Sequence, residues 1–116
     1  MELVPPEKLA THHCVPCEGG VAPLTRTEFS VYLPQIQEWQ VLDEKKLERE
    51  FVFSDFKKTV EFINQIAAIA ESEGHHPDLF LHDYKKCTVT LSTHAIGGLS
   101  VNDFVLAVKI DALHLQ

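Results

Sequence analysis

Two short runs of alternating apolar and polar residues, each followed by a helical pattern, constrain the fold of this chain more than any other feature. The runs are KLEREFVF at residues 46–53 and CTVTLSTH at residues 87–94. Alternation at every second position is typical of a half-buried strand. Each run follows another short extended segment across a charged turn, WQVLD at residues 39–43 and DLFLH at residues 78–82. The pattern therefore predicts two β-hairpins and an antiparallel sheet.

The alternation also assigns side chains to the two faces of the sheet. Three apolar side chains of the second run share one face, which we expect to be the core: Cys87, Val89 and Leu91. His94 has the opposite parity and ends the run. In the first run, Arg49 interrupts the apolar face, which indicates that an edge or an end of the sheet lies nearby.

The segment between the two hairpins predicts the longest helix. In residues 55–73, apolar side chains recur every three or four positions, as on one face of a helix. The members of this stripe are Phe56, Val60, Ile63, Ala67 and Ala70. Ser54 is a candidate N-cap. Gly74 is a natural end, because glycine readily adopts the left-handed conformation that closes many helices.

Two further helices complete the pattern. Thr25 or Thr27 can cap a short helix that Pro34 interrupts, and Ser100 opens a final helix over residues 101–114. The element order is then α-β-β-α-β-β-α. This order predicts an α+β domain of two layers, with the helices packed on one face of a four-stranded antiparallel sheet.

The chain divides into two parts. Residues 1–24 contain four of the six prolines and a Gly-Gly pair, which predicts an irregular N-terminal arm. Residues 25–116 form the single domain. The start of the chain carries an acidic residue and two prolines where a secretory signal would be basic and then apolar, so the cytoplasm is the expected location.

Charge and composition exclude several classes of partner. The formal net charge is −7, with 10 Lys and Arg against 17 Asp and Glu, so direct binding to nucleic acid is not expected. No apolar run is long enough to span a membrane. The cysteines are Cys14, Cys17 and Cys87, an odd number that indicates reduced thiols.

The most suggestive candidates for chemistry are two adjacent histidines after the long helix. His75 and His76 lie between Gly74 and Pro77, and the proline favours an extended backbone at the residue before it. Glu71 lies four residues before His75, so its carboxylate could orient that imidazole if the helical path continues. The alternative is that this stretch is simply a polar turn at the exit of a helix.

Two more candidates lie near the Gly-Gly turn at residues 97–98. His94 ends a strand beside that turn, where it could line a pocket or simply be solvated. Asp103 fits a weak capping box with Ser100, a structural role that does not exclude a place in a pocket.

The run HHCVPC at residues 12–17 contains four possible metal ligands. Its Cys-x-x-Cys is half of a zinc site, but Cys87 is assigned to the core and no second half remains. A metal-binding protein is therefore a third-ranked hypothesis, and we expect no metal.

The ordered set Glu71-x-x-x-His75-His76-Pro77, then His94, then Asp103 resembles the signature of the pterin-4a-carbinolamine dehydratase family. The segments LEREFVFSDF, AESEGHHPD and VTLSTHAIGGLSVNDF match that family in order and spacing, over residues 25–113. The CVPCEGG segment is similar to the leader of bacterial members.

The resemblance implies an enzyme, a 4a-hydroxytetrahydrobiopterin dehydratase. Such a hydro-lyase removes water from 4a-hydroxytetrahydropterin to give quinonoid dihydropterin, and so recycles the cofactor of aromatic amino acid hydroxylases such as phenylalanine hydroxylase. No cofactor is implied, because the pterin is the substrate. Family members form homodimers or homotetramers. Vertebrate members also stabilise the dimer of a homeodomain transcription factor, so the alternative function is a non-enzymatic interaction module or coactivator.

The resemblance also implies roles for individual residues. His75, His76 and His94 match the essential histidines, which carry out general acid–base catalysis. Glu71 and Asp103 match the flanking carboxylates. The residues implied in substrate binding are His75, His76, Pro77, Thr93, His94, Ala95, Ile96 and Trp39.

Overall fold

The two predicted hairpins join into one sheet through their longer strands. The structure is a computed structural model, and it describes residues 4–15 and 21–114. The strands are β1 (Gln40–Leu42), β2 (Lys46–Val52), β3 (Asp78–His82) and β4 (Lys86–Leu91). They form an antiparallel sheet in the order β1-β2-β4-β3, so each hairpin contributes one central and one edge strand. The predicted α+β class and the antiparallel sheet are confirmed.

Both hairpin turns place two consecutive residues in the left-handed region of backbone space. Asp43 and Glu44 have φ of 52° and 57°, and Asp83 and Tyr84 have φ of 50° and 51°. Each loop has three residues, since Leu42 pairs with Lys46 and His82 with Lys86, and two consecutive positive φ values match the right-handed twist of the flanking strands. Asp43 belongs to the first turn, although the sequence pattern assigned it to the extended segment of residues 39–43.

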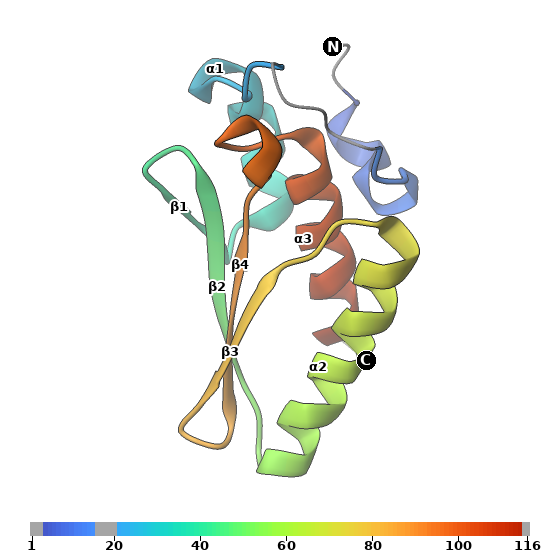
Figure 1. The fold of residues 1–116 in the computed structure, drawn as a ribbon, viewed down its shortest axis with the longest axis vertical. Helices are drawn as coiled ribbons and strands as arrows, with labels where there is room; N and C mark the ends of the chain where they lie inside the picture. Colours follow the sequence, from blue (N-terminus) through green and yellow to red (C-terminus); the bar gives the residue numbers. More distant parts are fainter. Residues whose placement is uncertain (1–3, 16–20, 115–116) are drawn as a thin grey trace.

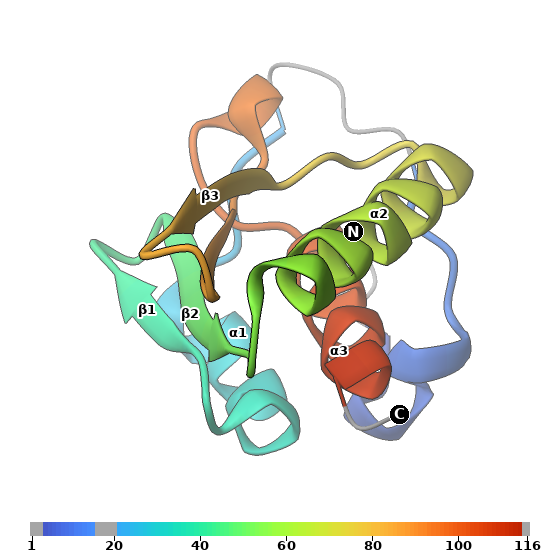
Figure 2. The same ribbon diagram turned by 90° about the horizontal axis from the view of Figure 1, so that it is seen from below.

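Helices α2 (Phe56–Glu73) and α3 (Val101–His114) cover one face of the sheet. Figures 1 and 2 show the two helices side by side in one layer and the strands in the other. The apolar face of the sheet lies beneath them, with Leu47, Cys87, Val89 and Leu91 fully buried. The predicted core face of β4 is therefore confirmed.

Arg49 lies on the core face of a central strand and has a partner there. Its guanidinium donates to Asp111 of α3 at 2.7 Å and lies over the ring of Phe51, 4.3 Å from the centroid. Arg49 lies just beyond the end of the edge strand β1, whose register with β2 ends at the pair Gln40–Glu48, so an end of the sheet is nearby as predicted. The charge is tolerated because the carboxylate from the facing helix neutralises it.

The long helix α2 differs from its prediction in two details. Its N-cap is Asp55 rather than Ser54, and the Asp55 carboxylate accepts from the Lys58 N–H at 2.8 Å. Its buried residues are Thr59, Phe62, Ile66 and Ala70. Of the predicted stripe, Ala70 is buried and Ile63 packs partly buried against the core, whereas Ala67 is exposed and Phe56 is 54% exposed. A second apolar stripe, through Phe62 and Ile66, faces the core. Thr59 can be buried beside it because its hydroxyl donates to the Asp55 carbonyl at 2.9 Å.

Helix α3 is buried on nearly every side, because it lies between α2 and two 3-10 helices, η1 (Pro6–Thr11) near the start of the chain and η2 (Ser30–Ile36). The 3-10 helix η2 contains Pro34 and continues α1 (Arg26–Phe29). Thr25 is the N-cap of α1, as one of the two predictions had it. No helix among the described residues is long and apolar enough to cross a membrane.

The N-terminal arm is more regular than the sequence suggests. Residues Pro6–Thr11 form the 3-10 helix η1, and Leu9 of this segment is fully buried. Proline at the first helical position suits such a turn, because its φ is already fixed near the helical value. The arm therefore contributes to the core.

Candidate functional site

The His75–His76 segment is held by the way α2 ends. Gly74 adopts φ of 68°, and its N–H donates to the Ala70 carbonyl at 2.9 Å. The chain then runs extended through Pro77 into β3. The predicted glycine end of the helix is confirmed, and it fixes where both imidazoles leave the backbone.

His75 forms a buried pair with Asp103. The His75 Nε2 and Asp103 Oδ1 atoms are 2.7 Å apart, and the side chains are 11% and 0% exposed. The Asp103 carboxylate also accepts from the Thr93 hydroxyl at 2.8 Å and from the Ser100 N–H at 2.9 Å. Because an ionised carboxylate only accepts hydrogen bonds, His75 Nε2 is the donor and Nδ1 carries the lone pair of the neutral ring. Asp103 therefore fixes the orientation and the tautomer of His75.

This geometry shows one half of the predicted capping box at Ser100. The Asp103 carboxylate reaches back to the Ser100 N–H, as a capping box requires. The Ser100 hydroxyl instead pairs with the Thr93 hydroxyl at 2.8 Å. The same carboxylate thus serves both the helix start and the histidine.

His94 is carried by a closed loop after β4. Thr93 and Gly98 pair as an isolated bridge, with the Thr93 N–H donating to the Gly98 carbonyl at 2.8 Å. Between them, the 3-10 helix η3 (His94–Ile96) begins at His94, so this residue lies beyond the strand rather than at its end. Gly98 is required by packing, because a Cβ there would lie 2.7 Å from Cβ of Pro23. The Thr93–Gly98 bridge and the contact with Pro23 therefore fix the two ends of the loop that carries His94.

The three histidines line one cavity of about 250 Å³. His75 and His76 come from the end of α2, and His94 comes from the loop after β4. The other lining residues are Val15, Gly74, Ser92, Thr93, Ala95 and Asn102. The structure thus brings together, within a single chain, the histidine set that the sequence singled out.

Glu71 is close to a different histidine from the one expected. Its Oε2 lies 3.1 Å from His76 Nε2, and the two side chains are 79% and 62% exposed. The predicted pairing of Glu71 with His75 was wrong, because the helix closes at Gly74 and His75 turns inward to Asp103. A contact between two side chains as exposed as these is weak in water.

Trp39 lies away from this cavity. Its ring is buried against Phe51, with centroids 6.1 Å apart, and its Nε1–H donates to Asp111 Oδ1 at 2.8 Å. Burial raises the pKa of Asp111, while Trp39 and Arg49 oppose that rise. Pro77 and Ile96 are half-buried neighbours of the histidines and are not among the residues that line the cavity.

The N-terminal arm forms a wall of the cavity, which no sequence pattern indicated. The Cys14 N–H donates to Glu73 Oε1 at 2.7 Å, and His13 Nδ1 lies 3.4 Å from Glu73 Oε2. These two members of the proposed metal-ligand run thus face Glu73, and Cys17 lies outside the described residues. Burial, and then the nearby Glu73 charge, raise the pKa of the Cys14 thiol to about 12.

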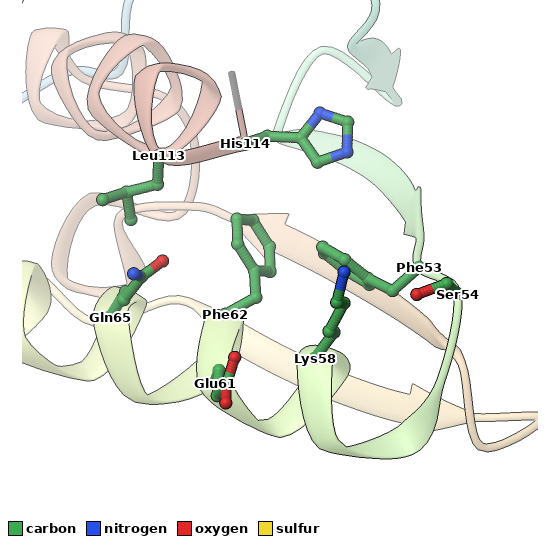
Figure 3. Close-up of a pocket in the computed structure, with 8 residues that line it drawn as sticks. All are labelled: Phe53, Ser54, Lys58, Glu61, Phe62, Gln65, Leu113 and His114. Carbon is green, nitrogen blue, oxygen red and sulfur yellow. The ribbon is translucent and has the colours of Figure 1, made fainter. Parts of the chain in front are cut away.

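A second cavity, of about 400 Å³, lies between the start of α2 and the end of α3 (Figure 3). Phe53 and Phe62 are among its apolar walls, and Lys58, Glu61 and His114 are among its polar residues. His114 packs edge-on against Phe53 and Phe62, at 5.7 and 6.1 Å between centroids. This cavity shares no lining residue with the histidine cavity, so the larger hollow does not coincide with the acid–base groups.

The sequence is similar to known proteins over most of its length. Residues 22–113 match the family described as pterin 4 alpha carbinolamine dehydratase. A protein of Nitrosospira multiformis, provisionally named a pterin-4-alpha-carbinolamine dehydratase, is 45% identical over 107 residues, which cover 92% of this chain and 93% of the relative. A protein of Alkaliphilus metalliredigens with the same provisional name is 46% identical over 104 residues, 89% of this chain and 93% of the relative.

Solved structures agree with the sequence matches. A protein of Brucella melitensis described as a transcriptional coactivator/pterin dehydratase superimposes with a TM-score of 0.74 at 34% identity, over 79% of this chain and 98% of that one. A pterin dehydratase-like protein described as a RuBisCO assembly factor has a TM-score of 0.57 at 22% identity, over 69% and 93% of the two chains. The second likeness concerns the fold alone.

Proposed function

The chain belongs to the pterin-4a-carbinolamine dehydratase family, and on that premise we propose that it removes water from 4a-hydroxytetrahydropterin to give quinonoid dihydropterin. The observation that carries this proposal is the meeting of His75, His76 and His94 around one cavity. Imidazoles are the side chains best suited to exchange protons near neutral pH.

The reaction needs two proton transfers and no electron transfer. The lone pair of nitrogen 5 forms a double bond to carbon 4a as the bond from carbon 4a to the hydroxyl oxygen breaks. The departing hydroxyl takes a proton from an acid and leaves as water. Nitrogen 5 loses its proton to a base. General acid–base groups typically accelerate such steps on the order of 10² to 10⁴-fold.

The environments of the histidines suggest different tasks. His75 is 11% exposed and bound to Asp103, so its free Nδ1 is a fixed proton acceptor. His76 is 62% exposed and His94 is also exposed, so both can exchange protons with water between turnovers. We propose that all three serve catalysis, with Asp103 as the positioning residue of His75 and Glu71 as a weaker partner of His76.

Substituting the three histidines one at a time tests this proposal. We expect His75→Ala, His76→Ala and His94→Ala each to lose most of the rate at which the protein speeds the decay of 4a-hydroxytetrahydropterin, by about tenfold or more. Stopped-flow absorbance follows that decay. His82→Ala is the matched control, because His82 lies on β3, bonded to Thr88, and does not line the cavity. The proposal fails if wild-type protein leaves the decay at its spontaneous rate.

The cellular setting belongs to the same proposal. We propose that the protein recycles the cofactor of an aromatic amino acid hydroxylase, such as phenylalanine hydroxylase, in the cytoplasm.

We also propose that it is a homodimer or homotetramer. Sedimentation velocity at micromolar concentration would give the monomer mass if this proposal is wrong.

One observation favours a second function. The Brucella melitensis protein is described as a transcriptional coactivator as well as a pterin dehydratase. If this chain acts as an interaction module, it binds a partner helix whether or not the histidines are intact. Co-elution with a candidate transcription factor that survives His94→Ala would favour that role over catalysis.

A further inference from the structure

The N-terminal arm reaches the histidine cavity at Val15. This side chain lines the cavity together with the three histidines and is 49% exposed. Most other lining side chains are polar, and Ala95 is the other apolar one. An apolar group that is half exposed at the wall of a polar cavity gains contact and loses water when a flat ligand enters.

The arm is held in this place by bonds on both sides of Val15. The Val15 N–H donates to Asn102 Oδ1 at 2.9 Å, and Asn102 Nδ2 donates back to the Val15 carbonyl at 2.5 Å. The amide of Asn102 thus pairs with both backbone groups of one residue. Asn102 is 3% exposed, so its side chain is well ordered by its surroundings.

The preceding residue is fixed as firmly. Glu73 accepts from the Cys14 N–H at 2.7 Å and from Lys109 Nζ at 2.7 Å, and its side chain is 6% exposed. Glu73 comes directly before Gly74 and His75, and Asn102 comes directly before Asp103. The arm is therefore bonded to the two segments that carry the His75–Asp103 pair.

We propose that Val15 is a substrate-binding residue that packs against the bicyclic ring of a reduced pterin, and that Asn102 is the positioning residue that holds it there. The proposal rests on the proposed function, because it assumes that the histidine cavity takes a pterin. It adds that a segment outside the predicted domain of residues 25–116 completes the binding site.

Binding of 7,8-dihydropterin, which lacks the 4a hydroxyl, tests the proposal by isothermal titration calorimetry. We expect Val15→Ala to raise the dissociation constant about threefold to tenfold, because two partly buried methyl groups are lost. In the dehydration assay the same variant raises KM by that factor and leaves kcat within about twofold, since no reacting group changes. Val31→Ala is the matched control, because Val31 is 48% exposed and does not line the cavity.

A double-mutant cycle tests the role of Asn102. We expect Asn102→Ala to weaken binding at least as much as Val15→Ala. The double variant should then be no weaker than Asn102→Ala alone, because a released arm no longer brings Val15 to the ligand. If Asn102→Ala does not fold, Val15→Ala alone decides whether Val15 binds substrate, since that side chain is half exposed and its loss does not threaten the core.

The outcomes separate this proposal from the proposed function. Wild-type affinity in Val15→Ala would overturn the proposal and leave the dehydratase assignment intact. Fully additive effects of the two substitutions would overturn the positioning role of Asn102. A wild-type protein that fails to bind 7,8-dihydropterin and fails to speed dehydration would overturn both proposals.

Discussion

The carboxylate of one residue, Asp103, connects His75 to the loop after β4 and to the start of α3. It accepts from three donors, one of which is the ring of His75. We expect Asp103→Asn to lower kcat for dehydration about 10²-fold, because an amide can turn its NH₂ toward His75 and favour the other tautomer. The pH profile of kcat distinguishes this from a structural effect, since a misoriented base changes the profile and a partly unfolded sample changes only the amplitude. A wild-type rate and profile would show that the pair is structural.

Each hairpin turn places one residue with a large side chain, Glu44 or Tyr84, at a positive φ that such residues rarely adopt. Tyr84 has φ of 51° and is 59% exposed, so its side chain contributes little that would offset the strain. We expect Tyr84→Gly to raise the free energy of unfolding by about 0.5 to 1 kcal/mol, because glycine adopts this conformation without a Cβ clash. Urea unfolding monitored by circular dichroism measures the change.

Tyr84→Ala is the control for that substitution. Alanine keeps the Cβ and the strain, so it should give no gain in stability. An equal gain from both variants would mean that removal of the aromatic ring, rather than relief of the backbone, is responsible.

At the scale of the whole molecule, Glu73 connects three segments: the arm, α2 and α3. Burial alone would raise the pKa of Glu73, but the bonds from Lys109, the Cys14 N–H and His13 outweigh burial and lower it to about 2. A carboxyl with a lowered pKa stabilises the fold above its ordinary value near 4.5, and this stabilisation is lost as the pH falls from there toward 2.

We therefore expect Glu73→Gln to cost about 2 to 3 kcal/mol at pH 7 and to make stability less dependent on pH between about 5 and 2. Denaturant unfolding at a series of pH values measures both effects. Glu61→Gln, on the exposed side of the same helix, should change stability by less than about 0.5 kcal/mol. A flat difference between wild type and Glu73→Gln across this pH range would contradict the linkage.

The elements of the fold were accessible from local sequence patterns. Period-two alternation identified β2 and β4, a glycine marked the end of α2, and Ser100 marked the start of α3. The predicted stripe of α2 identified the helix but only part of its buried face, because a second apolar stripe through Phe62 and Ile66 runs along it and local periodicity cannot say which one faces the sheet. Local periodicity also could not explain a charged Arg49 on the apolar face of β2, because its partner Asp111 lies 62 residues away in the chain.

The amino-acid sequence was enough to predict the α+β class, the order of the elements and, through the family signature, the histidines that line the cavity. These follow from backbone preferences and from motifs that act within a few residues. Three features became visible only in the folded chain: His75 bonds to Asp103, Trp39 lies in the core, and Val15 of the arm reaches the cavity. Such contacts depend on how helices, sheet and arm pack together, and a pair such as Val15 and Asn102, 87 residues apart, leaves no local pattern in the chain.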